Sequence, residues 1–119
     1  MLEITIEGVD HEFDYLIGLR GNLTFSELEK FKNTIYKLIQ YGATRIVFDL
    51  SRLKILSSEG IGVIISVMKR AQIKNGKVVL LDLSPTVKQI FDASDLYNLF
   101  EIYENRADLV SSSEVIELE

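Results

Sequence analysis

The sequence predicts an α/β fold, in which a mixed sheet of about five strands is covered by about four helices packed mainly on one face. Short apolar runs alternate along the chain with longer segments in which apolar residues recur every three or four positions. The 119 residues are enough for one hydrophobic core, and no linker, internal repeat or low-complexity segment divides them. We therefore expect residues 1–119 to form a single domain.

The first two strands are predicted to form a hairpin. Residues 2–7 alternate apolar and polar side chains, as in a half-buried strand, and we place this strand at an edge of the sheet. A polar turn over residues 8–12 leads to a second strand over residues 13–19. His11, the only histidine, lies in this turn without a second ligand nearby, so a solvated turn residue is favoured over a metal ligand or general base.

Residues 20–24 are expected to leave the sheet and to lead into the first helix. Thr24 with Glu27, or Ser26 with Glu29, has the spacing of a capping box. The helix carries one apolar stripe, and Gly42 is placed just after its end, where a left-handed conformation costs glycine least. This helix is interpreted as structural.

Two near-continuous apolar runs, residues 45–50 and 77–81, are predicted to be central strands with both faces covered, as in a parallel sheet. A helix over residues 57–75 connects them. Ser84 and Pro85 have the residue types of an N-cap and a first helical position, so a further helix is expected to run to about residue 93. A strand over residues 99–103 and a helical stretch over 105–110 complete the fold.

The helix over residues 57–75 is assigned two faces by its spacing. The face toward the sheet is predicted to hold Ile61, Ile64, Ile65, Met68 and Ala71. The outward face is predicted to hold Val63, Ser66, Val67, Arg70 and Ile73. Aliphatic residues on an outward face indicate either partial burial by neighbouring helices or a partner-binding patch, here ringed by Lys69, Arg70 and Lys74.

Composition excludes several classes of function. A net charge of −5 without a basic cluster argues against nucleic acid and against anionic membranes as partners. No apolar run approaches the roughly 20 residues that span a bilayer, and the N-terminus has no signal-peptide pattern, so we expect a cytoplasmic protein. The chain has no cysteine, which excludes disulfides and thiolate metal sites.

The sequence also contains no pattern typical of an enzyme. A phosphate-binding loop, a dinucleotide fingerprint and a paired nucleophile and base are all absent. Four aspartates near strand ends are better explained by turns and caps than by a hard cation: Asp49, Asp82, Asp92 and Asp95. We expect no catalytic residue, no cofactor and no metal.

Two serines mark the start of the central helix. Ser57 and Ser58 are both suitable N-cap residues, and capping is the ordinary role of a serine at this position. A helix N-terminus is also where a phosphate is best tolerated, because free N–H groups and the positive end of the helix dipole favour negative charge. A phosphoserine here would leave the fold intact and change the surface offered to a partner.

The run from Asp49 to Ala71 resembles the signature of the STAS domain, found in bacterial anti-sigma factor antagonists and in the tails of anion transporters. Its centre is Leu-Ser-Ser-Glu-Gly-Ile-Gly-Val-Ile over residues 56–64. The segments over residues 19–23 and 84–91 also look like those of the family, so the resemblance covers almost the whole chain. It implies that a serine kinase, which is also the anti-sigma factor, phosphorylates Ser58. It further implies that the unphosphorylated antagonist binds this kinase and frees the sigma factor.

The sequence departs from the family pattern around the phosphoacceptor. Ser57 replaces the usual aspartate, Glu59 replaces the usual small residue, and Thr24 replaces an acidic residue. Ser57 is therefore a second candidate acceptor, and Glu59 places a fixed carboxylate beside the site. The predicted partner-binding residues are Ser57, Ser58, Glu59, Gly60, Val63, Val67 and Arg70.

Three functions remain open at this point. The first is the phosphorylation-controlled antagonist, acting as a monomer or weak dimer on its anti-sigma factor. The second is a STAS adaptor that binds constitutively, as a subunit of a signalling scaffold or lipid-transport complex, and is not phosphorylated. The third, a small enzyme, is disfavoured by the lack of a paired nucleophile and base.

Overall fold

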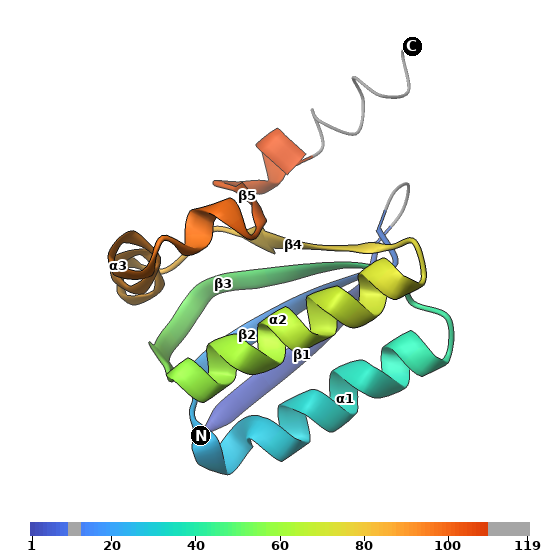
Figure 1. Cartoon of the computed structure of the whole chain (residues 1–119), viewed down its shortest axis with the longest axis horizontal. Coiled ribbons are helices and arrows are strands. Elements are labelled where there is room, and N and C mark those ends of the chain that lie inside the picture. Colours follow the sequence, from blue (N-terminus) through green and yellow to red (C-terminus); the bar gives the residue numbers. More distant parts are fainter. Residues whose placement is uncertain (10–12, 110–119) are drawn as a thin grey trace.

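The computed structural model of the chain describes residues 1–9 and 13–109, so His11 lies outside the described residues. Its five-stranded sheet has the order β1-β2-β3-β4-β5 (Figure 1). The bounds are Leu2–Gly8 for β1, Tyr15–Leu23 for β2, Arg45–Leu56 for β3, Lys77–Leu81 for β4 and Glu101–Tyr103 for β5. Strand β1 pairs antiparallel to β2 and the remaining pairs are parallel, which confirms the mixed sheet and the edge position of the first strand.

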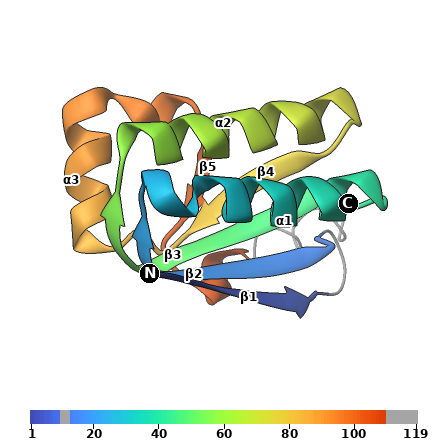
Figure 2. The same ribbon diagram turned by 90° about the horizontal axis from the view of Figure 1, so that it is seen from below.

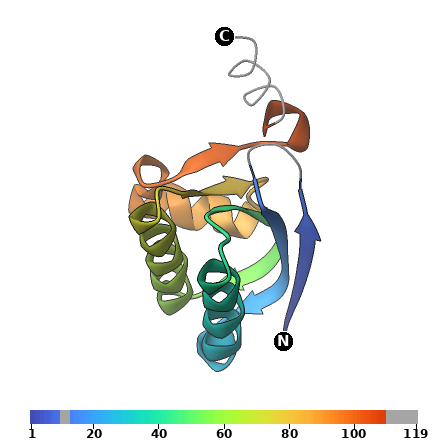
Figure 3. The ribbon, with the colours of Figure 1, turned by 90° about the vertical axis from the view of Figure 1, so that its right-hand side faces the viewer.

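Three helices are packed on this sheet: α1 (Leu28–Gln40), α2 (Ser58–Ile73) and α3 (Pro85–Ser94). Helices α1 and α2 lie side by side along one face, and α3 lies at one end of the molecule against β3 (Figures 2 and 3). A fourth helical turn covers residues 106–109. The prediction of about four helices, mainly on one face, is confirmed. Among the described residues, no helix combines the length and the apolar character that crossing a membrane requires.

The core lies on both faces of the sheet, as the apolar strands predict. On the helix-covered face, Phe48 of β3 packs against Phe31 of α1 with 5.7 Å between ring centroids. On the opposite face, Val47 belongs to a smaller apolar cluster with Phe13, Leu16, Val79, Leu81 and Leu109. Successive residues of β3 point to opposite faces, so both of its sides are buried.

Strands β2 and β3 are longer than predicted. Of residues 20–24, which were predicted to leave the sheet, residues 20–23 stay in it, because β2 continues to Leu23, which pairs with Leu56 of β3. Two register shifts in this pair interrupt the period of two that marks a strand in sequence. Gly21 adopts a φ of +104°, and a Cβ there would lie 2.4 Å from the carbonyl oxygen of Met1. The close approach of β1 thus requires glycine at this position.

The helix ends agree with the sequence prediction at two positions and differ from it at the start of α1. Gly42 has a φ of +111°, and Ser84 caps α3 by accepting a hydrogen bond from the N–H of Val87, both as predicted. The capping boxes at the first helix are wrong, since the short 3₁₀ turn η1 (Phe25–Glu27) precedes α1 and neither helix start has a side-chain cap. The last strand is shorter than predicted, because it begins only at Glu101. A second 3₁₀ turn, η2 (Leu96–Asn98), precedes it.

Candidate functional site

Ser57 joins the ends of two strands to the start of α2. Its N–H and its Oγ donate to the carbonyl oxygen of Leu23 at 3.1 and 3.2 Å, and its Oγ accepts from the N–H of Gly60 at 3.0 Å. The half-buried hydroxyl therefore both donates and accepts a hydrogen bond inside the protein. Ser57 is the N-cap of α2, and this geometry favours a structural role for it over that of phosphoacceptor.

The cap assigned to Ser57 gives a testable prediction. Ser57→Ala should lower the free energy of unfolding by about 1 kcal/mol, because the N–H of Gly60 loses its acceptor. Ser58→Ala is the matched control and should change it by less than about 0.5 kcal/mol, because the Ser58 hydroxyl is exposed and caps no backbone group. Urea unfolding followed by circular dichroism measures both, and an equal effect of the two changes would contradict the assignment.

Ser58 is the first residue of α2 and its side chain is exposed. Its Oγ donates to Oε2 of the neighbouring Glu59 at 3.2 Å, and Glu59 is exposed as well. The first intrahelical bond runs from the N–H of Ile61 to the carbonyl oxygen of Ser57, so the N–H groups of Ser58 and Glu59 lie ahead of it. The hydroxyl is thus reachable by a large partner and lies at the positive end of the helix dipole.

Gly60, one of the predicted partner-binding residues, lies beneath the surface of the protein. It is buried, and a Cβ at this position would lie 3.0 Å from the carbonyl oxygen of Leu23 and 3.1 Å from side-chain carbons of Leu23 and Leu56. Its lack of a side chain lets the first turn of α2 pack against the ends of β2 and β3. Gly60 therefore packs against Leu23 and Leu56 under the site and has no side chain at its surface.

Val67 was wrongly placed on the outward face, since its side chain is 0% exposed. It follows Ile64 by three residues and precedes Ala71 by four, and side chains at those spacings share a helix face. Ile64, Met68 and Ala71 are buried as predicted, and Ile61 and Ile65 are half-buried against the core. Val67 is a core residue and is excluded from any partner surface.

The remaining predicted residues of α2 do not form one site. Val63 is partly buried against the core, one turn after Glu59. Arg70 is exposed, and its guanidinium lies over the ring of Tyr36 on α1 at 4.1 Å from the centroid. Arg70 lies twelve positions after Ser58, which is about 18 Å along a helix axis. Of the predicted set, Ser57, Ser58, Glu59 and Val63 lie at the start of the helix with side chains that are not fully buried, and the hydroxyl of Ser57 is used by the cap.

Phe25 is a surface residue that the sequence interpretation missed. It lies in η1, between β2 and α1, and is 79% exposed. Turn η1 and the start of α2 lie at the same end of the sheet (Figures 1 and 2). The chain enters η1 just after Leu23 and enters α2 just after Ser57, and these two residues are hydrogen-bonded to each other. In sequence, Phe25 stands three residues before Leu28 and so looks like the first member of the buried stripe of α1.

A metal site is not formed by the part of the chain that the structure describes. No three histidine, cysteine, aspartate or glutamate side chains gather there closely enough to hold an ion. Asp82 and Asp95 instead occupy left-handed turn positions, with φ of 55° each.

Comparison with known proteins identifies the fold and the family. The STAS domain matches residues 4–109. The anti-sigma F factor antagonist of Paenibacillus polymyxa is 27% identical over 116 residues, which are 97% of this chain and 99% of that protein. The structure of the anti-sigma factor antagonist SpoIIAA in its unphosphorylated form has a TM-score of 0.74 at 26% identity and covers 90% of this chain and 93% of that one. The phosphorylated form of SpoIIAA, a Bacillus cell fate determinant, has a TM-score of 0.71 at 26% identity over 92% and 99% of the two chains.

Anti-sigma factor antagonists are regulators and not enzymes, in agreement with the absence of a catalytic pattern from the sequence. The matched segment contains strands β2–β5, the three helices α1–α3 and all of β1 except its first two residues. The chain therefore belongs to the STAS domain family of anti-sigma factor antagonists.

Proposed function

We propose that this protein is an anti-sigma factor antagonist that binds an anti-sigma factor with serine kinase activity, and that phosphorylation of Ser58 controls this binding in the cytoplasm. The observation that carries the proposal is the exposed hydroxyl of Ser58 at the first position of α2. This is the position that the STAS signature gives to the phosphoacceptor. A protein 26% identical to this chain exists in an unphosphorylated and a phosphorylated form, which supports the same chemistry here.

The surroundings of Ser58 favour a switch of surface over a switch of fold. Ser57 already caps the helix through the N–H of Gly60, so adding a phosphate to Ser58 breaks no backbone contact. The helix dipole and the N–H groups of the first turn stabilise the added negative charge. The modification would replace a small neutral hydroxyl by a dianion at the point where the partner docks.

The docking surface that we propose contains Ser58, Glu59, Val63 and Phe25. The first three lie in the first turns of α2, and Phe25 adds an exposed aromatic side chain from η1. Exposed aromatic residues are strong anchors in protein interfaces, because burying their apolar surface is favourable and their few rotatable bonds limit the entropy lost. An exposed anchor at the same end of the sheet as the modifiable hydroxyl would allow one phosphate to disturb the contact.

Glu59 makes this site different from the STAS family pattern, which has a small residue after the phosphoacceptor. Its carboxylate accepts from the Ser58 hydroxyl at 3.2 Å, so a phosphate on Ser58 would meet a like charge that salt screens only over about 8 Å. Either the kinase supplies a basic residue to Glu59, or Glu59 itself holds the surface in a partly phosphorylated-like state. The second case favours the alternative function, a constitutive adaptor that needs no phosphorylation.

A mass measurement separates the two functions. Wild type, Ser57→Ala and Ser58→Ala are each incubated with ATP and a candidate anti-sigma factor kinase, and their intact masses are compared. We expect one phosphate on wild type and on Ser57→Ala, and none on Ser58→Ala, because of the two candidate hydroxyls only that of Ser58 is exposed. Phosphate on Ser58→Ala would reject the acceptor, and no phosphate on any protein with normal partner binding would make this chain a constitutive adaptor.

A further inference from the structure

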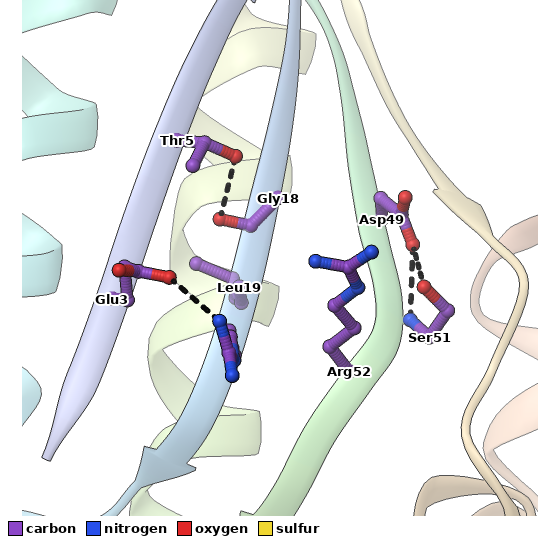
Figure 4. Close-up of a pocket in the computed structure, with 8 residues that line it drawn as sticks. Glu3, Thr5, Gly18, Leu19, Asp49, Ser51 and Arg52 are labelled. Carbon is purple, nitrogen blue, oxygen red and sulfur yellow. Dashed lines mark hydrogen bonds and ion pairs between the residues drawn. The ribbon is translucent and has the colours of Figure 1, made fainter.

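The face of the sheet opposite α1 and α2 is divided into an apolar and a polar half. The apolar half is the cluster around Val47 and Leu109. The polar half is a hollow of about 180 Å³ across β1, β2 and β3 (Figure 4). The polar side chains that line it are Glu3, Thr5, Arg20, Asp49, Ser51 and Arg52.

A bulge in β3 brings two arginines to this hollow. Gly18 pairs with Asp49 and Arg20 pairs with Arg52, so β3 uses one residue more than β2 over the same stretch. The extra residue turns Arg52 to the face that already holds Arg20 and Asp49. The two cations therefore occupy directly paired positions of neighbouring strands, where like charges destabilise a sheet.

The carboxylates of the hollow do not neutralise both arginines. Glu3 lies 3.6 Å from the guanidinium of Arg20, whereas Oδ1 of Asp49 accepts from the N–H and the Oγ of Ser51 at 3.0 and 2.7 Å. Arg52 makes no hydrogen bond or ion pair with any described residue, and its guanidinium lies between β2 and β3 in Figure 4. Its planar set of donors is left available to a ligand.

Two further hollows continue from the first one. They have volumes of about 360 and 620 Å³, and Arg20 and Lys54 line both of them. The larger one also contains Arg52 and reaches Ser84, Pro85 and Thr86 at the positive end of α3. A chain of net charge −5 thus gathers three cations in one basin, although its sequence contains no basic cluster.

We propose that this basin binds a small ligand that carries at least two anionic groups, carboxylate or phosphate, and that the ligand bridges Arg20 and Arg52. Guanidinium groups bind both kinds of oxyanion through paired hydrogen bonds. An anion between the two arginines removes their mutual repulsion, which no described residue does for Arg52. The basin lies on the face of the sheet opposite α2, so this binding does not use Ser58 and is independent of the proposed partner.

Calorimetric titration with two probes tests the proposal. Pyrophosphate and citrate are titrated separately into the unphosphorylated protein at an ionic strength held constant with sodium chloride. We expect one saturable site for at least one probe, and the better probe tells whether phosphate or carboxylate is preferred. Arg52→Gln should weaken this binding at least tenfold, and Lys69→Gln, an exposed cation on α2, should change it by less than twofold.

A charge reversal separates binding from folding. Arg52→Glu places a carboxylate opposite Arg20, so the melting temperature should stay the same or rise while probe binding is lost. Absence of saturable binding of both probes to wild type would overturn the proposal. Equal binding by wild type and Arg52→Gln would overturn it as well.

Discussion

Replacing Val67 with aspartate should unfold the protein or remove more than about 4 kcal/mol from its free energy of unfolding. The side chain is 0% exposed and packs in the main core between α2 and the sheet. An aspartate there would bury a carboxylate without a partner, which is a large cost against the roughly 5–15 kcal/mol that stabilise a typical domain. Urea unfolding followed by circular dichroism measures the loss.

Two further variants show whether the loss arises from burial. Ile73→Asp introduces the same charge on the same helix at a side chain that is 81% exposed, and it should change the free energy of unfolding by less than about 0.5 kcal/mol. Val67→Ala removes apolar contacts without adding charge and should cost about 2 kcal/mol, from lost burial and the cavity left behind. A Val67→Asp protein as stable as the Ile73→Asp protein would contradict the core assignment.

Much of the fold could be predicted because periodicity reports burial directly. The continuous apolar run of β3 and the stripe of α1 each mark elements that the structure contains. The second halves of β2 and β3 could not be predicted, because register shifts break the alternation there. Val67 shows a different error, since the spacing that places it beside Ile64 and Ala71 is present in the sequence.

The site was predictable only where it is continuous in sequence. Ser58 and its cap neighbour Ser57 lie in one motif, and the structure gives them the distinct geometries described above. Phe25 could not be recognised as a surface residue from the sequence, because its exposure depends on η1, which interrupts the helix pattern. The basic basin was hidden because Arg20 and Arg52 are far apart in sequence and become neighbours only through strand pairing and a bulge.

Replacing Phe25 with alanine should weaken binding of the unphosphorylated protein to its anti-sigma factor by about 30-fold, which corresponds to about 2 kcal/mol. The ring is 79% exposed in the free protein, so a partner that covers it gains the burial of a large apolar surface. For the same reason the change should leave the melting temperature nearly unaltered. Surface plasmon resonance against the immobilised anti-sigma factor measures the affinity, and we expect most of the change in the dissociation rate.

Tyr41→Ala is the matched control for Phe25→Ala. Tyr41 is 84% exposed and follows the other end of α1, a helix of 13 residues and therefore about 20 Å long. An aromatic side chain at that end of α1 lies outside the proposed surface, so its loss should change the affinity by less than twofold. If Phe25→Ala and Tyr41→Ala weaken binding equally, exposed aromatic residues contribute to binding wherever they lie, and Phe25 is not a specific anchor. If Phe25→Ala has no effect while phosphorylation of Ser58 still abolishes binding, the partner contacts α2 without reaching η1, and Phe25 must be removed from the surface.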